Sequence, residues 1–443
     1  MTVEFKKNKS YCLYPFKAAV LSNKNGETTP CCRYKGNGEP NGLVKKGFSN
    51  LFRDIRKDML NGKLIEGCWV CYKEESVGRA SMRTSALKKR DWNTSIRGLT
   101  NTVYSEKEFM LKKLPTRVKR NLQTPKLEYL EIESGRYCNL KCRSCGPSLS
   151  TSWDEDVLKD KKVLQNFYGE DGYRHADLVK TPKQNEELFK LTLNECKDLK
   201  EIKVTGGEPF LTDAFLKFLE NLVEWGLSKN IILEIFTNCS FFPKEKYQTI
   251  LLQFETVYIN LSLDGTGKRA EFLRKKSKWS VVKQVASYWN DYSVKNKNIH
   301  LMISHTVSIF NILYLNSFIK WAFEFFDKKV IEDIFSLEQD FIQLTLVHSP
   351  LYLSPYNFSK KVKDAIINQL RNNINQLRNK NYASKGQFRS QIEDIVDFIV
   401  TMFDGTNEVD RKEEFLEKTN LFDKVRNENW KEVFPELAEL LND

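Results

Sequence analysis

The chain has 443 residues, which at roughly 100–200 residues per domain allows two or three domains and a large buried core. Its composition is that of a globular protein, with 41% hydrophobic and 29% charged residues. No apolar run is long enough to span a membrane and no secretory signal opens the sequence, so we expect a cytoplasmic protein. The net charge of +12 admits an anionic partner, but the basic runs are short, which argues against direct binding of nucleic acid.

Residues 1–90 are rich in loops and in cysteine, and we expect them to form a domain of their own. Within them one helix is predicted, with Ser49 as its N-cap and Gly62 at its end. Its apolar face consists of Leu51, Phe52, Ile55 and Met59. Residues 91–124 are basic and polar and have no apolar period, which predicts a linker on the surface.

Residues 125–348 alternate between strands and helices. Six strands are predicted, at 127–133, 201–205, 231–237, 256–263, 299–309 and 341–347. Helices are predicted at 212–226, 243–252, 268–290 and 312–327, and residues 160–195 are long enough for an inserted helical piece. Repeated β–α units give a parallel sheet, and six strands are too few for a complete eight-stranded barrel. We therefore expect an α/β fold, a partial (β/α)6 TIM-like barrel.

Residues 349–443 are predicted to form a C-terminal helical region. It carries three apolar stripes: Val362, Ile366, Leu370, Ile374 and Leu377; Ile392, Val396, Ile399 and Phe403; and the stretch WKEVFPELAELL at 430–441. Stripes of this kind are more typical of packing faces than of cofactor contacts.

The ten cysteines are clustered, and in a reducing cytoplasm clustered thiols indicate metal or redox chemistry rather than disulfides. Cys138, Cys142 and Cys145 follow the first predicted strand of the sheet, at the end where parallel sheets bind ligands. Three thiolates hold three irons of a [4Fe–4S] cluster and leave the fourth iron open. The alternative is a zinc site that takes its fourth ligand from elsewhere, although nothing pairs the nearby His175 with this loop.

The sequence CNLKCRSC, followed in order by TGGEPFL, FTNCS, LSLDGTG and TVSIFN, resembles the radical S-adenosylmethionine (SAM) superfamily over about residues 127–311. The resemblance implies that Cys138, Cys142 and Cys145 hold a [4Fe–4S] cluster whose open iron chelates SAM. Reductive cleavage of SAM then yields methionine and a 5′-deoxyadenosyl radical, which abstracts hydrogen from a substrate. A low-potential electron donor such as flavodoxin or ferredoxin is implied as well.

The same resemblance implies cofactor-binding residues at the strand ends: Gly206, Gly207, Glu208, Pro209, Asn238, Ser262, Asp264 and Ser308. The two glycines let the backbone approach the amine of SAM, and Glu208 accepts a hydrogen bond from it. If the resemblance is set aside, the simpler interpretation is that Asp264 begins a turn with Gly265 and that Ser308 caps the end of a strand. Two residues depart from the family pattern, because Ser144 replaces an aromatic residue that commonly packs on adenine and Cys239 replaces a glycine that often follows Thr-Asn.

The early cysteines resemble, in their spacing, the twitch or SPASM auxiliary-cluster modules of radical SAM enzymes. The implied ligands of a second [4Fe–4S] cluster are Cys12, Cys31, Cys68 and Cys71, with Cys32 spare or an alternate ligand. A structural zinc ribbon suits the same four thiolates. Such modules usually follow the barrel, so we expect residues 1–90 to fold back and cap its open end.

Many relatives with such a module modify peptides or proteins, so a peptide or protein substrate is expected, with a nucleotide or another small molecule as the competitor. A non-catalytic protein that binds zinc and nucleic acid is the other class of function. It explains the cysteines and the positive charge, but it does not explain a Gly-Gly-Glu-Pro motif after a strand or the order of the strand-end motifs.

Overall fold

The computed structural model describes residues 10–21, 27–40, 50–76, 81–88, 125–163, 165, 189–337, 339–347, 349–378 and 409–442. The chain divides into two compact units. The first unit contains Met1–Gly135, Gln184–Gly206 and Ala214–Leu233, and the second contains Arg136–Lys183, Gly207–Asp213 and Glu234–Asp443. Among the described helices, none combines the length and the apolar character that crossing a membrane requires.

The first unit is built on a mostly parallel sheet. β4 (Tyr129–Glu133) lies between β6 (Glu201–Thr205) and β1 (Ala18–Leu21), and the three strands run parallel. β2 (Glu27–Thr29) and β3 (Glu39–Pro40) continue the sheet antiparallel beyond β1. β4 and β6 confirm two predicted strands. β1 and β2 flank Asn25 and Gly26 and pair antiparallel, which confirms the hairpin that an Asn-Gly turn predicts. The parallel pairing of β1 with β4 was not predicted.

A buried ion pair fastens the residue before β1 to the residue before β4. Lys17 Nζ lies 2.9 Å from Glu128 Oε2, and the two side chains are 4% and 10% exposed. Glu128 N also donates to Lys17 O at 2.8 Å, and Tyr14 packs edge to face on Tyr129 with ring centroids 5.9 Å apart. The cysteine-rich segment is therefore joined to β4 by backbone pairing, charge and aromatic contact.

Replacing Lys17 with methionine is expected to lower the free energy of unfolding by about 3–5 kcal/mol, because Glu128 would stay buried without its closest cation. Glu128 also pairs with Lys200 at 3.6 Å, but the Lys200 side chain is 63% exposed. The matched Lys200→Met variant should therefore lose less than about 1 kcal/mol. Urea denaturation of both variants at pH 7 measures the difference, and equal losses would show that burial of Lys17 does not govern the pair.

The helices of the first unit include the one predicted near its start. α2 (Asn50–Leu60) buries Phe52, Ile55 and Met59, and Gly62 follows it with a φ of +77°. α12 (Asp213–Glu224) confirms the predicted 212–226 helix, and its Phe215 packs on Phe189. The remaining helices of this unit are α1 (Tyr14–Lys17), η2 (Glu66–Cys68), α3 (Trp69–Ser76), α4 (Met82–Lys88), α11 (Leu193–Cys196) and η6 (Ser228–Asn230).

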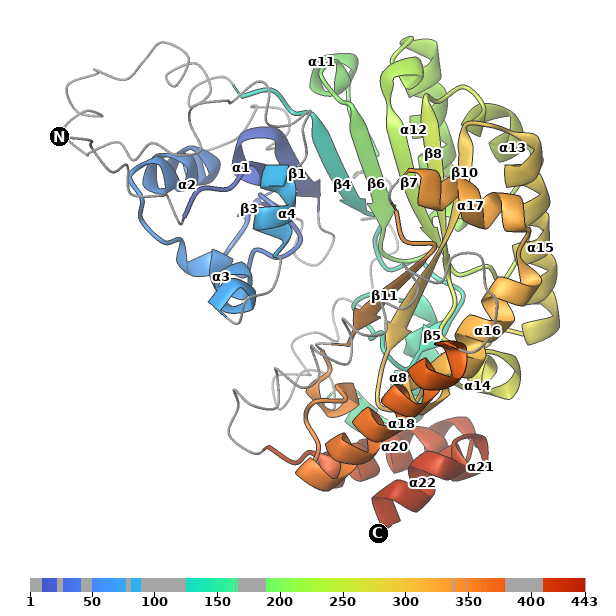
Figure 1. Ribbon diagram of the computed structural model, residues 1–443. Helices are drawn as coiled ribbons and strands as arrows, with labels where there is room; N and C mark the ends of the chain where they lie inside the picture. Colours follow the sequence, from blue (N-terminus) through green and yellow to red (C-terminus); the bar gives the residue numbers. More distant parts are fainter. Residues whose placement is uncertain are drawn as a thin grey trace. The chain divides into compact units, whose positions relative to one another are not determined.

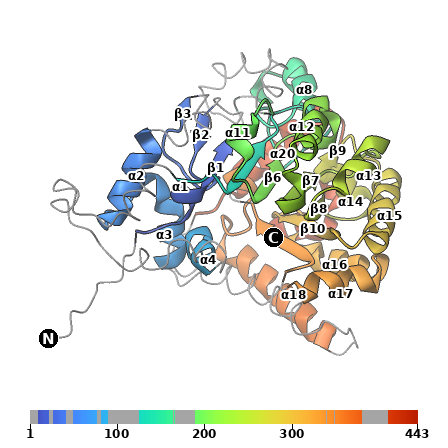
Figure 2. The same ribbon diagram turned by 90° about the horizontal axis from the view of Figure 1, so that it is seen from above.

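The second unit holds the other predicted strands. β10 (Ile299–Val307) lies between β8 (Thr256–Ser262) and β11 (Ile342–Leu346) and is parallel to both. β8 is next to β7 (Ile232–Thr237), which enters this unit at Glu234. Helices α13 (Glu245–Leu251) and α15 (Trp279–Lys295) cover one side of these strands (Figures 1 and 2). The expected α/β class with a mostly parallel sheet is confirmed.

Two predicted helices differ from the observed ones. The stretch 268–290 is not one helix but α14 (Gly267–Leu273), a short strand β9 (Arg274–Lys275) and α15. The stretch 312–327 is η7 (Ile312–Tyr314) followed by α16 (Leu315–Phe325), and α17 (Lys328–Ser336) comes after it without having been predicted. The helical period of the sequence continues through β9, so the sequence gives no sign of the break. β9 forms by pairing with β5, which is distant along the chain.

The C-terminal helices gather at one end of the second unit (Figure 1). α18 (Lys360–Arg378) buries Val362, Ile366 and Leu370 of the first predicted stripe, and the third stripe forms α21 (Trp430–Val433) and α22 (Pro435–Asn442). α20 (Lys412–Arg426) also falls in the predicted helical region, although none of the three stripes marks it. Several predictions lie outside the described residues: Ser49, the linker at 91–124, most of the 160–195 insertion with His175, and the second stripe at 392–403.

Candidate functional site

The three-cysteine loop begins the second unit and is held by a pair of short strands. β5 (Lys141–Cys142) pairs antiparallel with β9, which places Cys142 opposite Arg274. Arg143 N extends the pairing by donating to Leu273 O at 2.7 Å, and Cys145 N donates to Cys142 O at 3.1 Å. The loop therefore takes its shape from the segment that joins α14 to α15.

Cys142 affects the pKa of both other thiols of this loop. Burial raises the pKa of Cys138 to about 12, and the neighbouring Cys142 adds to the rise. Burial also raises the pKa of Cys145, to which Cys142 and Cys138 both contribute. Such thiols stay protonated at neutral pH until a metal displaces the proton.

The arrangement of donors can be compared with the two kinds of metal group. Among the residues that the structure describes, no three histidine, cysteine or acidic side chains converge tightly enough to hold one metal ion. Three thiols on one loop match the donor set of an iron–sulfur cluster with one open iron, whereas a closed zinc site needs a fourth ligand from elsewhere.

Arg274 is a site residue that the sequence analysis missed. Its Nη1 lies 3.8 Å from Cys142 Sγ, and its Nε lies 2.8 Å from Asp264 Oδ2. Burial opposes the charge of this guanidinium, but Asp264 and Cys142 outweigh that effect and raise the pKa of Arg274 above its usual value. Asp264 Oδ1 also accepts a hydrogen bond from Thr306 N at 2.9 Å, so within the chain this carboxylate positions the arginine.

Glu208 is fully buried and ties the Gly-Gly-Glu-Pro segment to the end of β7. Its Oε1 accepts hydrogen bonds from Thr237 Oγ1 at 3.0 Å and Phe210 N at 3.3 Å, and its Oε2 accepts one from Asn238 N at 2.7 Å. Burial raises the pKa of Glu208 to about 7, although these three donors oppose the rise. Pro209, which follows Glu208, is the first residue of η5 (Pro209–Leu211). Gly207, which precedes Glu208, is half-buried.

The Thr-Asn-Cys turn after β7 lies beside the cysteine loop. Asn238 Nδ2 donates to Asn139 Oδ1 at 2.9 Å and lies 3.7 Å from Cys138 Sγ. Asn238 Oδ1 accepts a hydrogen bond from Ser240 Oγ at 2.6 Å, and Ser240 Oγ in turn accepts one from Asn139 Nδ2 at 2.7 Å. Cys239 has a φ of +55°, in the left-handed region that favours glycine, which accounts for the glycine that the family pattern has there.

The remaining predicted residues occupy strand ends. Gly206 has a φ of +102°, and a Cβ at this position would lie 2.6 Å from Ser134 N, so the close approach of β4 and β6 requires a glycine. Ser308 is buried, and its N donates to Asn311 Oδ1 at 2.7 Å, as expected of a residue that caps a strand end. Ser262 ends β8 and is half-buried.

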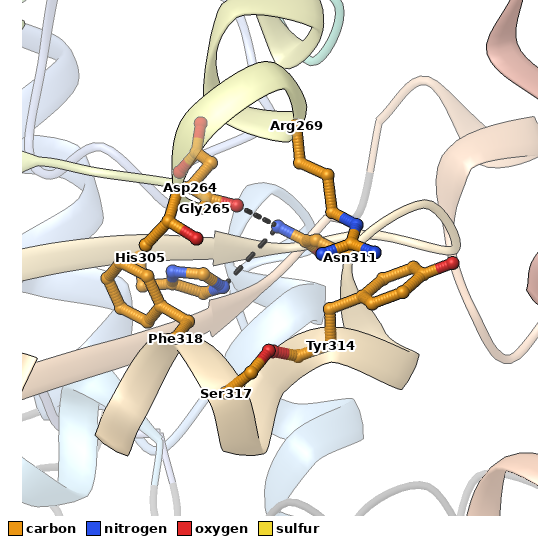
Figure 3. Close-up of a pocket in the computed structure, with 9 residues that line it drawn as sticks. Asp264, Gly265, Arg269, His305, Asn311, Tyr314, Ser317 and Phe318 are labelled. Atoms are coloured by element: carbon orange, nitrogen blue, oxygen red, sulfur yellow. Dashed lines mark hydrogen bonds between the residues drawn. The ribbon is translucent and has the colours of Figure 1, made fainter. Parts of the chain in front are cut away.

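A pocket opens near Asp264 (Figure 3). Its lining consists of Asp264, Gly265, Thr266, Arg269, His305, Asn311, Tyr314, Ser317 and Phe318. Figure 3 shows Asn311 between Asp264 and His305, where Asn311 Nδ2 donates to Asp264 O at 2.9 Å. The ring of His305 packs on Phe318 with centroids 4.2 Å apart, and its Nδ1 lies 2.8 Å from Leu263 O. The pocket therefore contains one predicted cofactor-binding residue, Asp264.

His305 should make stability depend on pH. Burial lowers its pKa to about 4, despite the opposing effects of Asp264 and the Leu263 carbonyl. Between pH 6.5 and pH 4 the unfolded chain binds a proton at His305 that the folded chain does not bind, so the free energy of unfolding should fall by about 3 kcal/mol as the pH drops through this window. His305→Asn, whose amide nitrogen takes the place of the imidazole Nδ1 and can still donate to Leu263 O, should lack this contribution in urea denaturation from pH 4 to 7.5. The same pH slope in both proteins would contradict the assignment.

The four early cysteines lie near one another in the first unit. Burial raises the pKa of Cys12, and Cys31, Cys68 and Cys71 add to that rise. Burial raises the pKa of Cys31 to about 12, again with contributions from Cys68 and Cys71. Cys32 is exposed, and its Sγ lies 3.8 Å from Met82 Sδ.

Comparison with known proteins gives one curated relative. No family model matches the sequence. The chain is 29% identical over 140 residues to GTP 3′,8-cyclase from Campylobacter lari, an alignment that covers 31% of this chain and 35% of the cyclase. The chain thus matches about a third of the length of that relative.

Solved structures with some similarity include three complexes. anSMEcpe with bound AdoMet and the Cp18Cys peptide is 20% identical, with 56% of this chain and 59% of that chain covered and a TM-score of 0.32. Streptococcus suis SuiB bound to S-adenosylmethionine is 15% identical over 74% of this chain and 64% of that chain, with a TM-score of 0.34. SuiB bound to the precursor peptide SuiA is 14% identical over 73% of this chain and 63% of that chain, with a TM-score of 0.33. These TM-scores are below 0.5, so nothing about this chain follows from them.

The sequence motifs lie at the strand ends where they were expected. The cysteine motif stands in the loop after β4, and the other four motifs begin within or at the ends of β6, β7, β8 and β10 in the family's order. The motifs therefore keep the strand order that the resemblance to the radical SAM superfamily predicts.

Proposed function

We propose that the chain cleaves SAM reductively at a [4Fe–4S] cluster held by Cys138, Cys142 and Cys145 and abstracts hydrogen from a substrate, on a partial (β/α)6 barrel. The observation that carries this proposal is the set of three free thiols on one loop with a buried cation, Arg274, 3.8 Å from the Cys142 sulfur. When bound, the cluster supplies the electron that breaks a carbon–sulfur bond of SAM.

The residues around the loop have separate roles in this proposal. Arg274 places a positive charge beside Cys142, where the carboxylate of SAM would be attracted, and Asp264 orients the guanidinium. Glu208 Oε2 receives a single hydrogen bond from the described residues, at 2.7 Å from Asn238 N, so it can accept another from the amine of SAM. Asn238 orients the loop through Asn139. Ser262 and Ser308 are proposed as weaker contacts of the cofactor or substrate.

The early cysteines are proposed to hold a second, auxiliary cluster. Support comes from the pKa of Cys12, because Cys31, Cys68 and Cys71 all contribute to its rise and must therefore lie near this thiol. Thiolate zinc is the alternative for this site. That residues 1–90 cap the open end of the barrel remains a prediction.

For the substrate we propose a peptide or protein, by resemblance to enzymes with an auxiliary module, with flavodoxin or ferredoxin as the electron donor. A nucleotide is the second candidate, because the curated relative is named for its action on GTP. A small precursor-peptide gene beside the gene of this enzyme would favour the first candidate.

The test is an anaerobic preparation, analysed for iron, labile sulfide and zinc and then incubated with dithionite and SAM. We expect two clusters, about eight irons and eight sulfides per chain, and slow release of 5′-deoxyadenosine. Zinc without sulfide at both sites, with no cleavage of SAM, would contradict the proposal and support a non-catalytic binding protein. Faster use of SAM with GTP than with candidate peptides would favour the nucleotide.

A further inference from the structure

The residues on either side of Cys142 are charged and buried, and both are held by the C-terminal region. Arg143 is 2% exposed, and its Nη2 lies 2.5 Å from Asp423 Oδ1 and 2.7 Å from Glu428 Oε2. Its guanidinium also packs on the rings of Phe272 and Phe422, at 4.1 and 5.6 Å from their centroids. α20 and the turn after it thus contact the cysteine loop 280 residues away in sequence.

Lys141, on the other side of Cys142, is held through an intermediate carboxylate. Lys141 Nζ lies 2.5 Å from Asp156 Oδ1, and Arg426 Nε lies 2.7 Å from Asp156 Oδ2. The side chains of Asp156 and Arg426 are both 0% exposed. The guanidinium of Arg426 packs on Trp153 at 4.2 Å from the ring centroid. Asp156 therefore connects the last turn of α20 to the residue that precedes Cys142.

The turn after α20 is itself well defined. Asn427 ends the helix in the left-handed conformation, with a φ of +54°. Asp423 Oδ2 accepts a hydrogen bond from Trp430 N at 2.7 Å, so the carboxylate that binds Arg143 also shapes the turn. Glu428 Oε1 lies 2.9 Å from Lys275 Nζ on β9, the partner strand of β5. The turn therefore contacts both strands that carry Cys142 and Arg274.

Stability alone does not account for this network. Taking paired charges out of water costs about as much as their attraction returns, and apolar replacements of similar volume are often as stable or more stable. Arg143 also keeps Nε and Nη1 buried with no hydrogen-bond partner among the described residues. Buried ion pairs that add little stability can still hold the backbone in one conformation. Here the ion pairs of Lys141 and Arg143 lie on either side of Cys142.

We propose that Asp423, Arg426 and Glu428 are positioning residues for the cysteine loop. Through Arg143 on one side and Asp156 with Lys141 on the other, they fix the backbone of Cys142 so that its thiol is presented beside Arg274. The consequence for catalysis rests on the proposed function, in which Cys142 binds the cluster, whereas the positioning itself is a property of the chain.

The first test uses the metal-free protein and measures the alkylation rate of the Cys142 thiol by mass spectrometry. Arg143→Gln and Glu428→Gln should each speed labelling of Cys142 by at least about tenfold, because losing one partner of a buried ion pair lowers the free energy of local opening. Arg143→Lys keeps the charge and should fall between Arg143→Gln and the parent. The matched control is Glu414→Gln, which removes ion pairs with Arg411 and Lys418 on the same helix without touching the loop.

Labelling of Cys196, a fully buried thiol of the first unit, reports on general unfolding in the same samples. If Arg143→Gln folds and labels Cys142 at the parent's rate, the positioning role is wrong. If Arg143→Gln speeds the labelling of Cys196 as much as that of Cys142, the variant has merely unfolded. The labelling of Cys142 in the milder Glu428→Gln variant then decides whether the positioning role is right.

The second test uses the reconstituted enzyme and the electron paramagnetic resonance spectrum of its reduced cluster. Glu428→Gln is expected to change this spectrum and to speed loss of the cluster in air several-fold, whereas Glu414→Gln should match the parent. An unchanged spectrum together with unchanged labelling would overturn the inference. A parent that takes up no cluster at all would refute the proposed function, while the labelling rates of Cys142 would still decide the positioning role.

Discussion

Replacing Cys142 with alanine is expected to lower cleavage of SAM by more than about 100-fold, since even the outer partners of metal ligands are worth about 10–100-fold. With only Cys138 and Cys145 left, the loop offers two thiolates to a group that needs three. The iron content should fall by about four per chain, and the early cysteines should keep theirs. Release of 5′-deoxyadenosine under dithionite, with iron and sulfide analysis, measures both effects.

The control for this variant is Cys196→Ala, which removes a buried thiol of the first unit that lies outside both cysteine groups. It should retain the iron content and the cleavage rate of the parent. If Cys142→Ala keeps a full complement of iron and cleaves SAM normally, the three-cysteine loop does not hold the catalytic cluster. Loss of iron in both variants would indicate general misfolding instead.

The six strands predicted between residues 127 and 347 were found because each of them combines β-branched or aromatic residues with a turn signal at its end. β6, β8 and β10 begin where predicted, and the motifs locate their ends. β9 and the pairing of β1 with β4 were missed. β9 is too short to show a period, and both pairings are made with a partner that is distant in the sequence.

The candidate site shows the same limit. Motif spacing pointed to Cys138, Glu208 and Asp264, because these residues sit at fixed offsets from strand ends. Arg274 belongs to none of the motifs, and its proximity to Cys142, 132 residues away, follows from the pairing of β5 with β9. The ion pairs of Arg143 involve an even longer separation and have no local signature in the sequence.

A large loss of metal and of substrate turnover is also expected when a proposed ligand among the early cysteines is replaced. The neighbouring Cys32, which is not a proposed ligand, provides the matched control. Cys68 and Cys32 are both thiols of the same segment. Cys68 adds to the raised pKa of both Cys12 and Cys31, whereas Cys32 is exposed and its Sγ lies 3.8 Å from Met82 Sδ. Only the first belongs to the proposed set of four ligands. The two alanine variants therefore separate a metal ligand from a neighbouring thiol.

Cys68→Ala should lose the metal of the early site, about four irons per chain or one zinc, and with it substrate turnover. Cleavage of SAM without substrate should stay within about twofold of the parent, because the two proposed clusters share no ligand. Cys32→Ala should match the parent in metal content and turnover. Normal substrate turnover by Cys68→Ala would show that the early site takes no part in the reaction. Loss of metal in Cys32→Ala would show that Cys32 is a ligand and that the proposed set of four is wrong.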